Sequence, residues 1–149
     1  MLALYLSPGS SSMATHIMLH EVGVDFESRW ISFAKRFPKA GLFPEGDLEA
    51  EAQVISWMSF IASTIHPARR IGVERWKEVF EIAEKRLARQ DWAVTRYSIA
   101  DIHLFRLFWR FFDAVHPAQE TYPGLSAHYE RMMARPAVQR VLEIERAVG

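Results

Sequence analysis

The amino-acid sequence predicts an α+β chain that is mostly α-helical, with a small strand–helix–strand unit followed by an all-α domain. Three observations indicate this fold class. The first residues change from a strand pattern to a helix pattern and back, residues 37–47 contain two prolines and two glycines, and apolar side chains then recur at helical spacing. The prolines and glycines separate the two parts, because these residues interrupt both helices and strands.

The N-terminal unit begins with an apolar run, residues 2–6, that is bounded by Ser7-Pro8-Gly9. Turn residues after a buried strand commonly lead into a helix, which is expected from Ser11 or Ser12 to Val22. Residues 24–30 then alternate between less polar and charged side chains, the pattern of a half-buried strand. We therefore predict a βαβ unit, whose crossover connection leaves its two strands parallel.

Residues 37–46 are predicted to be a linker, and the all-α domain is expected over residues 47–149. Asp47 is a suitable N-cap for the first helix. The apolar face of that helix contains Val54, Trp57 or Met58, Ile61 and Ile65. Pro67 is expected to end it at His66, because proline lacks the N–H that continues a helix.

Further helices follow this first one. Residues 73–89 repeat the apolar spacing, and an apolar run from Ile99 predicts a helix that ends near His116-Pro117. Another helix is marked by Leu125, Tyr129, Met132 and Met133. Pro136 opens the last helix, at a first helical position where its missing N–H has no cost.

Ser98 and Asp101 predict the start of the helix from Ile99 in unusual detail. The Ser98 hydroxyl can accept from the backbone N–H of Asp101, while the Asp101 carboxylate accepts from the N–H of Ser98. Tyr97 can pack on Ile102 as a hydrophobic staple. The helix that follows is apolar nearly all round, so other elements should cover most of its faces. We expect it to be the central helix of the core.

Three segments, in this order, resemble the cytosolic glutathione S-transferases, in particular their bacterial beta-class-like members. Residues 5–26 resemble the first strand, active-site loop and first helix of that family, and residues 55–66 resemble the first helix of its helical domain. Residues 98–101 match the Ser/Thr-x-x-Asp that opens its buried central helix. The resemblance implies a truncated thioredoxin-like domain over residues 1–36, followed by the linker and the family's all-α C-terminal domain.

The middle of the thioredoxin-like domain has no counterpart in this sequence. In the family, the second strand is followed by a helix, a strand opened by a cis-proline, another strand and a third helix. Here Lys35-Arg36 continues directly into Phe37-Pro38. The segment without a counterpart would contain the Val-Pro and Glu/Gln-Ser with which the family binds glutathione. Two interpretations follow: an enzyme that conjugates glutathione, or a non-catalytic relative that serves as a protein-interaction module.

The loop before the first predicted helix contains the candidate catalytic residues Ser10 and Ser11. A glutathione thiolate there would gain from the helix dipole and from a serine hydroxyl, which lower the pKa of a thiol. Ser11 stands where beta-class relatives have a reactive cysteine, and the sequence has no cysteine, so the expected chemistry is thiolate activation rather than thiol exchange. Tyr5 could offer its phenol to the same thiolate. The alternatives are that the serines only cap the helix and that Tyr5 is a core residue.

Further candidates lie in the helical domain. By resemblance His66 faces the glutathione sulfur, although a histidine near a helix end is also favoured by the dipole alone. Trp109 is a candidate for the substrate pocket, but a core position is the favoured interpretation. The arginines at 69, 70, 106 and 110 are most simply solvated or ion-paired, although one facing the cleft could bind a carboxylate. No metal site is expected, because the pair His16 and His20, followed by Glu21, lacks a further ligand.

Charge and composition limit the partners. The sequence has 18 basic and 18 acidic residues, so its zero net charge gives no electrostatic reason to bind nucleic acid or an anionic membrane. No run of eighteen apolar residues and no signal-peptide pattern occurs, which favours the cytoplasm. The partners expected from the resemblance are glutathione as co-substrate, a small hydrophobic electrophile and a second copy in a homodimer.

Overall fold

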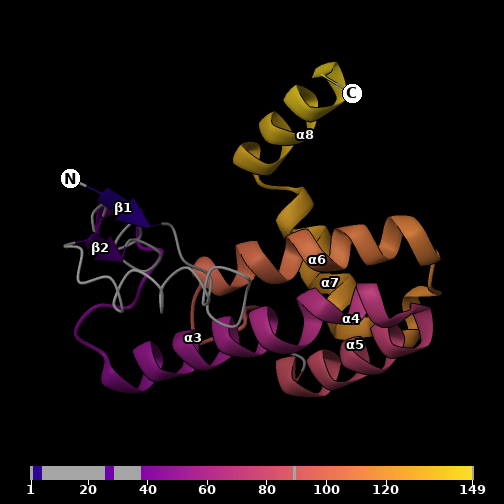
Figure 1. Cartoon of the computed structure of the whole chain (residues 1–149), viewed down its shortest axis with the longest axis horizontal. Coiled ribbons are helices and arrows are strands. Elements are labelled where there is room, and N and C mark those ends of the chain that lie inside the picture. The colour runs from indigo at the N-terminus through magenta and orange to yellow at the C-terminus, as the bar shows by residue number, and fades with distance from the viewer. Residues whose placement is uncertain (1, 5–25, 29–37, 89, 149) are drawn as a thin grey trace.

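The computed structural model describes residues 2–4, 26–28, 38–88 and 90–148, with side chains described over 38–88 and 90–143 (Figure 1). Most of this part is helical. The helical elements after the first strands are η1 (Pro38–Ala40), α3 (Leu48–Phe60), η2 (Ile61–Ile65), α4 (His66–Ile71), α5 (Val73–Leu87), α6 (Ile99–Val115), η3 (Gln119–Thr121), α7 (Pro123–Met133) and α8 (Pro136–Val148).

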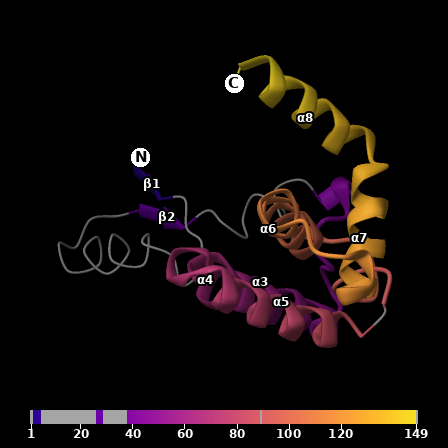
Figure 2. The same cartoon turned by 90° about the vertical axis from the view of Figure 1, so that its right-hand side faces the viewer.

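The helices form layers around α6. Figure 2 shows α3, α4 and α5 in one layer, α6 above them, and α7 beside α6. α6 contacts α3, α5 and α7, whereas α8 leaves the end of α7 and extends away from the α3–α5 layer. Among the described helices, none is long and apolar enough to cross a lipid bilayer.

Two short strands, β1 (Leu2–Leu4) and β2 (Phe26–Ser28), pair in parallel. In this register Leu2 lies opposite Phe26, and Leu4 lies opposite Ser28. The two strands are parallel, and each is shorter than the pattern that predicted it. Residues 5–25 lie outside the described part, so the helix of that unit stays a prediction.

The expected end of the first helix at His66 is wrong. The helix that Asp47 caps, by accepting from the N–H of Ala50 at 3.0 Å, continues without interruption from α3 through η2 into α4. η2 is a π-helical turn in which the His66 N–H donates to the carbonyl of Ile61, five residues back. This wider turn shifts the hydrogen-bond register. Pro67 then occupies the first turn of α4, where a backbone N–H is not required for an intrahelical hydrogen bond. The helix ends at Ile71.

The other predicted helices are confirmed, with ends within two residues of those expected. Ala88 and His116 follow α5 and α6 in the left-handed conformation, with φ of 49° and 48°. Both helices therefore end with a reversal of backbone direction. Pro136 is the first residue of α8, as its predicted role requires.

The core is built on the apolar faces of α6 and α5. Phe108 and Phe111 are buried, and their rings lie 5.3 Å and 4.5 Å from the ring of Phe80. Trp76 packs edge-on against Phe111, with ring centroids 5.2 Å apart. Aromatic pairs at these spacings add to the stabilisation from burial. The prediction that α6 is the central, mostly covered helix is confirmed.

A partly buried contact between α5 and α7 fixes the start of α7. The backbone N–H groups of Gly124 and Leu125 donate to the Glu84 carboxylate at 2.7 Å and 2.8 Å. A carboxylate at a helix N-terminus satisfies free N–H groups and interacts favourably with the helix dipole. Glu84 is forty residues from Gly124 in sequence, so no local sequence pattern predicts this cap.

Candidate functional site

The structure describes only part of the predicted site. Ser10, Ser11 and Tyr5 lie outside the described residues, as do His16, His20 and Glu21. His66, Trp109, Ser98 and Asp101 lie within them. In the described ranges, no group of three or more histidine, aspartate or glutamate side chains is arranged to bind a metal ion.

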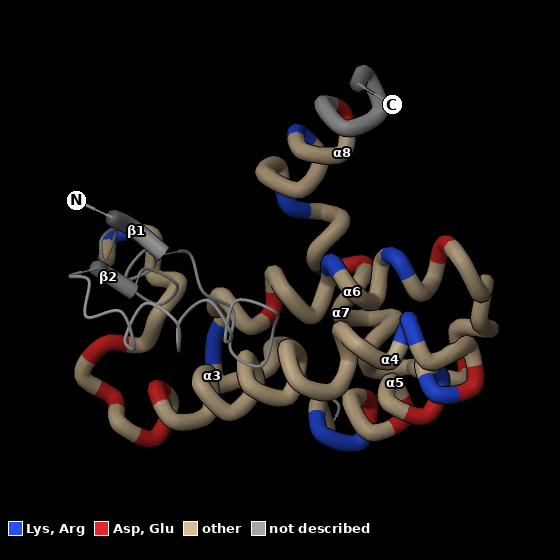
Figure 3. The backbone as a smooth tube through the Cα atoms, viewed as in Figure 1, with Lys and Arg blue, Asp and Glu red and all other residues tan. Residues whose placement is uncertain are grey.

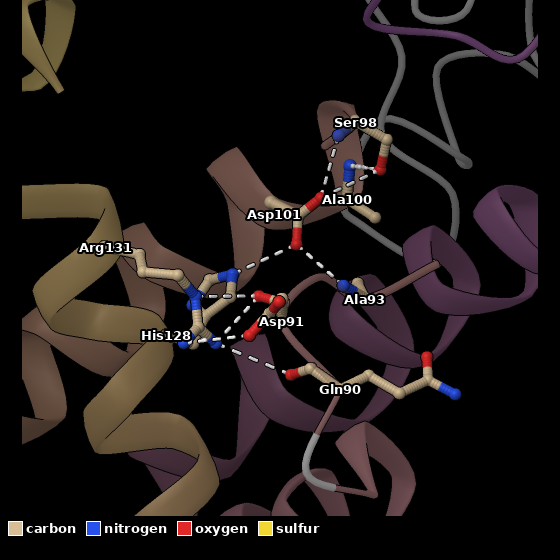
Figure 4. A network of polar contacts seen from close by, with 8 residues as sticks. All are labelled: Gln90, Asp91, Ala93, Ser98, Ala100, Asp101, His128 and Arg131. Carbon is tan, nitrogen blue, oxygen red and sulfur yellow. Dashed lines mark hydrogen bonds and ion pairs between the residues drawn. The ribbon is translucent and has the colours of Figure 1, made fainter. Parts of the chain in front are cut away.

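Ser98 and Asp101 form the predicted capping box at the start of α6. The backbone N–H of Ser98 donates to Asp101 Oδ2 at 2.8 Å, and Ser98 Oγ accepts from the N–H of Ala100 at 3.3 Å (Figure 4). The Ser98 hydroxyl in turn donates to Asp101 Oδ2 at 3.1 Å. Both side chains are buried. They hold the helix end in place.

The other Asp101 oxygen binds two groups that sequence reasoning missed. Asp101 Oδ1 accepts from the backbone N–H of Ala93 at 2.8 Å and lies 3.0 Å from Nε2 of His128 on α7 (Figure 4). His128 is 1% exposed and Asp101 is 0% exposed, so this pair is inaccessible to a substrate. The only sequence signal for His128 is its position within the apolar stripe from Leu125 to Met132.

His66 lies in a hollow between α4 and α6 that we call the arginine hollow. Its volume is about 350 Å³. Three arginines line it, Arg69 and Arg70 from α4 and Arg110 from α6. The remaining lining residues are Ile65, Trp76 and Leu107. The hollow therefore brings together a predicted site residue and three basic side chains from two separate helices. Basic stretches on α4 and α6 are visible in Figure 3.

The electrostatic field in the arginine hollow is positive. Partial desolvation lowers the pKa of His66, an exposed residue, below its ordinary value, and the positive charges of Arg106, Arg70 and Arg110 lower it further. The imidazole is consequently uncharged near neutral pH. No acidic residue lines the hollow. Within the described part of the chain, Arg70 and Arg110 make no hydrogen bond or ion pair, and Arg69 contacts only the Trp76 ring, at 5.9 Å.

Trp109 lines a second hollow, which we call the apolar groove. It lies between α6 and α8 and has a volume of about 370 Å³. Its apolar walls include Ile102, Phe105, Met132, Val138, Val141 and Leu142. Arg106 and Arg110 also line it, so Arg110 borders both hollows. Trp109 thus faces a groove instead of packing fully into the core.

Acid is expected to destabilise the fold through His103 on α6. Burial lowers the pKa of His103 below its ordinary value of 6.5, and the charge of Arg106 lowers it further. The unfolded chain therefore binds a proton more readily than the folded chain, and stability is lost as the pH falls through 6.5. We expect the melting temperature to fall less steeply with acidification in His103→Gln than in the wild type. Parallel melting curves of the two proteins against pH would contradict this.

A comparison with protein families matches the helical part of the chain. Residues 56–136 match the family model described as "Glutathione S-transferase, C-terminal domain". The matched range begins within α3 and ends at the first residue of α8. It therefore contains α4 and α6, between which the arginine hollow lies. No curated protein sequence matches the chain significantly.

Solved structures resemble nearly the whole chain in fold. A ternary complex of BphK, a bacterial GST, has a TM-score of 0.64 at 20% identity and covers 97% of this chain and 99% of that chain. A glutathione transferase homologue from Sulfitobacter with bound glutathione has a TM-score of 0.67 at 22% identity, covering 97% and 98%. A glutathione S-transferase from Xylella fastidiosa has a TM-score of 0.61 at 22% identity, covering 96% and 98%.

Proposed function

Because this chain belongs to the glutathione S-transferase family through its C-terminal domain, we propose that it activates the glutathione thiolate for conjugation to a small electrophile. The co-substrate is glutathione, which is bound in the similar Sulfitobacter structure. Ser11 is the proposed donor to the thiolate, with Ser10 and Tyr5 as rivals, and His66 supports the sulfur from the helical domain. We also propose that the protein works as a homodimer.

The observation that carries this proposal is the position of His66 in the arginine hollow. An uncharged imidazole has one N–H that can donate to a sulfur anion. The surrounding guanidiniums favour a negative charge, because nearby opposite charges stabilise the ionised form of an acid. A thiol brought to this hollow would therefore have a lowered pKa. Trp76 also lines the hollow, and its indole Nε1 is buried without a partner among the described residues.

The proposed reaction transfers the glutathionyl group by nucleophilic displacement. The thiol proton leaves to solvent, and the thiolate sulfur forms a bond to an electrophilic carbon. The leaving group, for example chloride on an aromatic ring, departs with its bonding electron pair. The protein stabilises the thiolate and orients the two reactants, which accounts for catalysis by positioning and electrostatics.

Conjugation of glutathione to 1-chloro-2,4-dinitrobenzene by the purified full chain tests the proposal. We expect the wild-type rate to exceed that of the uncatalysed reaction. His66→Ala should lower the enzymatic rate about tenfold, because a rise of one unit in the thiol pKa reduces the thiolate fraction by that factor. His66→Gln should retain more activity, because its amide keeps an N–H donor. Thiolate absorbance of bound glutathione, titrated against pH, should show the higher thiol pKa in His66→Ala.

The contrary outcome separates the two candidate functions. A folded protein that neither binds glutathione nor accelerates conjugation would contradict the enzyme proposal. The chain would then be a non-catalytic relative in which the helical domain serves as a protein-interaction module. Equal activity of wild type, His66→Ala and His66→Gln would retain the enzyme and remove His66 from its mechanism.

A further inference from the structure

We propose that the arginine hollow binds the carboxylate of an acidic electrophile, whose apolar body extends into the apolar groove. This inference rests on the proposed conjugation and deepens it, because it names the class of second substrate: an aromatic or aliphatic acid with an electrophilic carbon. Arg70 and Arg110 are the proposed carboxylate-binding residues, and Trp109 contacts the apolar body.

The first argument is the uncompensated charge of the hollow. Arg69, Arg70 and Arg110 line one concave surface with no acidic side chain among them. Elsewhere in the described chain, Arg75 pairs with Glu78 at 2.9 Å and Arg131 with Asp91 at 3.3 Å. A cluster of guanidiniums without partners in the described chain repels itself, and an anion relieves that repulsion. Arginine is suited to this task because its planar fork binds a carboxylate through two parallel hydrogen bonds.

The second argument is the position of Arg110. It lines both the arginine hollow and the apolar groove. A ligand with its acid group at Arg110 therefore has apolar surface available at Trp109, Phe105 and Val138. A fully hydrophobic ligand would leave the guanidiniums unused, and a small inorganic anion would leave the groove unused. The two hollows together fit an organic acid.

Glutathione itself has carboxylates, so it is the alternative ligand for Arg70 and Arg110. Competition distinguishes the two sources. If Arg70 and Arg110 bind a carboxylate of glutathione, S-methylglutathione should displace an acidic probe from them. If they bind the second substrate while the glutathione sulfur lies beside His66, the acidic probe and S-methylglutathione should bind together. We expect joint binding.

The test is direct binding of 3-nitrobenzoate to the full chain, measured by calorimetry with 3-nitrobenzamide as the neutral match. We expect the acid to bind about tenfold more tightly than the amide, the effect of one charge-assisted hydrogen bond. The His66 ring resonances should shift on addition of the acid and move little on addition of the amide. The probe is unreactive, so this result does not depend on conjugation.

Variants identify the residues responsible. Arg110→Gln and Arg70→Gln should each reduce the preference for the acid, and the double variant should abolish it. Arg96→Gln is the matched control, because Arg96 is exposed and lines neither hollow. These arginines are exposed, so folding is expected to be unaffected, and melting curves check it.

Each outcome decides the inference separately from the proposed function. Equal affinity for acid and amide, displacement of the acid by S-methylglutathione, or an acid preference that survives the double variant would overturn it. Conjugation of neutral electrophiles without any acid preference would leave the proposed function standing alone. Tight acid binding without any conjugation would retain the hollow as an acid site and remove the enzyme.

Discussion

Replacing Asp101 by alanine is expected to lower the free energy of unfolding by several kcal/mol, because each buried donor left without an acceptor costs about 1–3 kcal/mol. The carboxylate is fully buried and binds four groups, from Ala93, from His128 and twice from Ser98. Alanine leaves those groups buried without an acceptor. The loss approaches the whole stability of a marginal domain.

Chemical denaturation measures this loss of unfolding free energy. A control variant and two further variants test its cause. Asp113→Ala is the matched control, because Asp113 is an exposed acid on the same helix with no hydrogen bond in the described chain. Asp101→Asn is also expected to be destabilising, since both carboxylate oxygens accept and an amide replaces one of them with a donor. Ser98→Ala should cost about 1 kcal/mol, the usual value of a lost cap. Unchanged unfolding in Asp101→Ala would refute this account of the core.

Local patterns predicted the helices from Val73 onward because their signals lie within each segment. Ser98 and Asp101 are three residues apart, and Pro136 marks a helix start by its own chemistry. The same proline rule failed at Pro67. There the upstream backbone adopts a π turn, so the helix continues although Pro67 lacks an N–H. Nothing in the local sequence distinguishes this π turn from a helix end.

The candidate site was less predictable because its parts come from separate elements. The sequence prediction left Arg69 and Arg70 between two helices, whereas the structure places them on α4. Their convergence with Arg110 depends on where α4 lies relative to α6. Likewise, the partnership of Asp101 with His128 joins residues 27 positions apart. A capping box is a local interaction, whereas a shared buried carboxylate is a tertiary one.

Ser11→Ala is expected to reduce the rate of glutathione conjugation about a hundredfold, the usual loss when one donor to a reacting anion is removed. The reason is chemical: the sequence has no cysteine, so the attacking sulfur must come from the co-substrate, and its thiolate needs a donor. Ser10→Ala should reduce the rate only in part. The measurement is kcat/KM with 1-chloro-2,4-dinitrobenzene, together with the thiol pKa of bound glutathione.

The pKa measurement separates a role in thiolate stabilisation from a role in capping the helix. A serine that only caps would lower the melting temperature when replaced and leave the thiol pKa unchanged, whereas a donor to sulfur would raise that pKa when removed. Ser59→Ala supplies the control, since Ser59 is exposed on α3 and its hydroxyl makes no hydrogen bond within the described chain. Full activity in both Ser10→Ala and Ser11→Ala would exclude the serines and leave the Tyr5 phenol as the donor to test, by Tyr5→Phe.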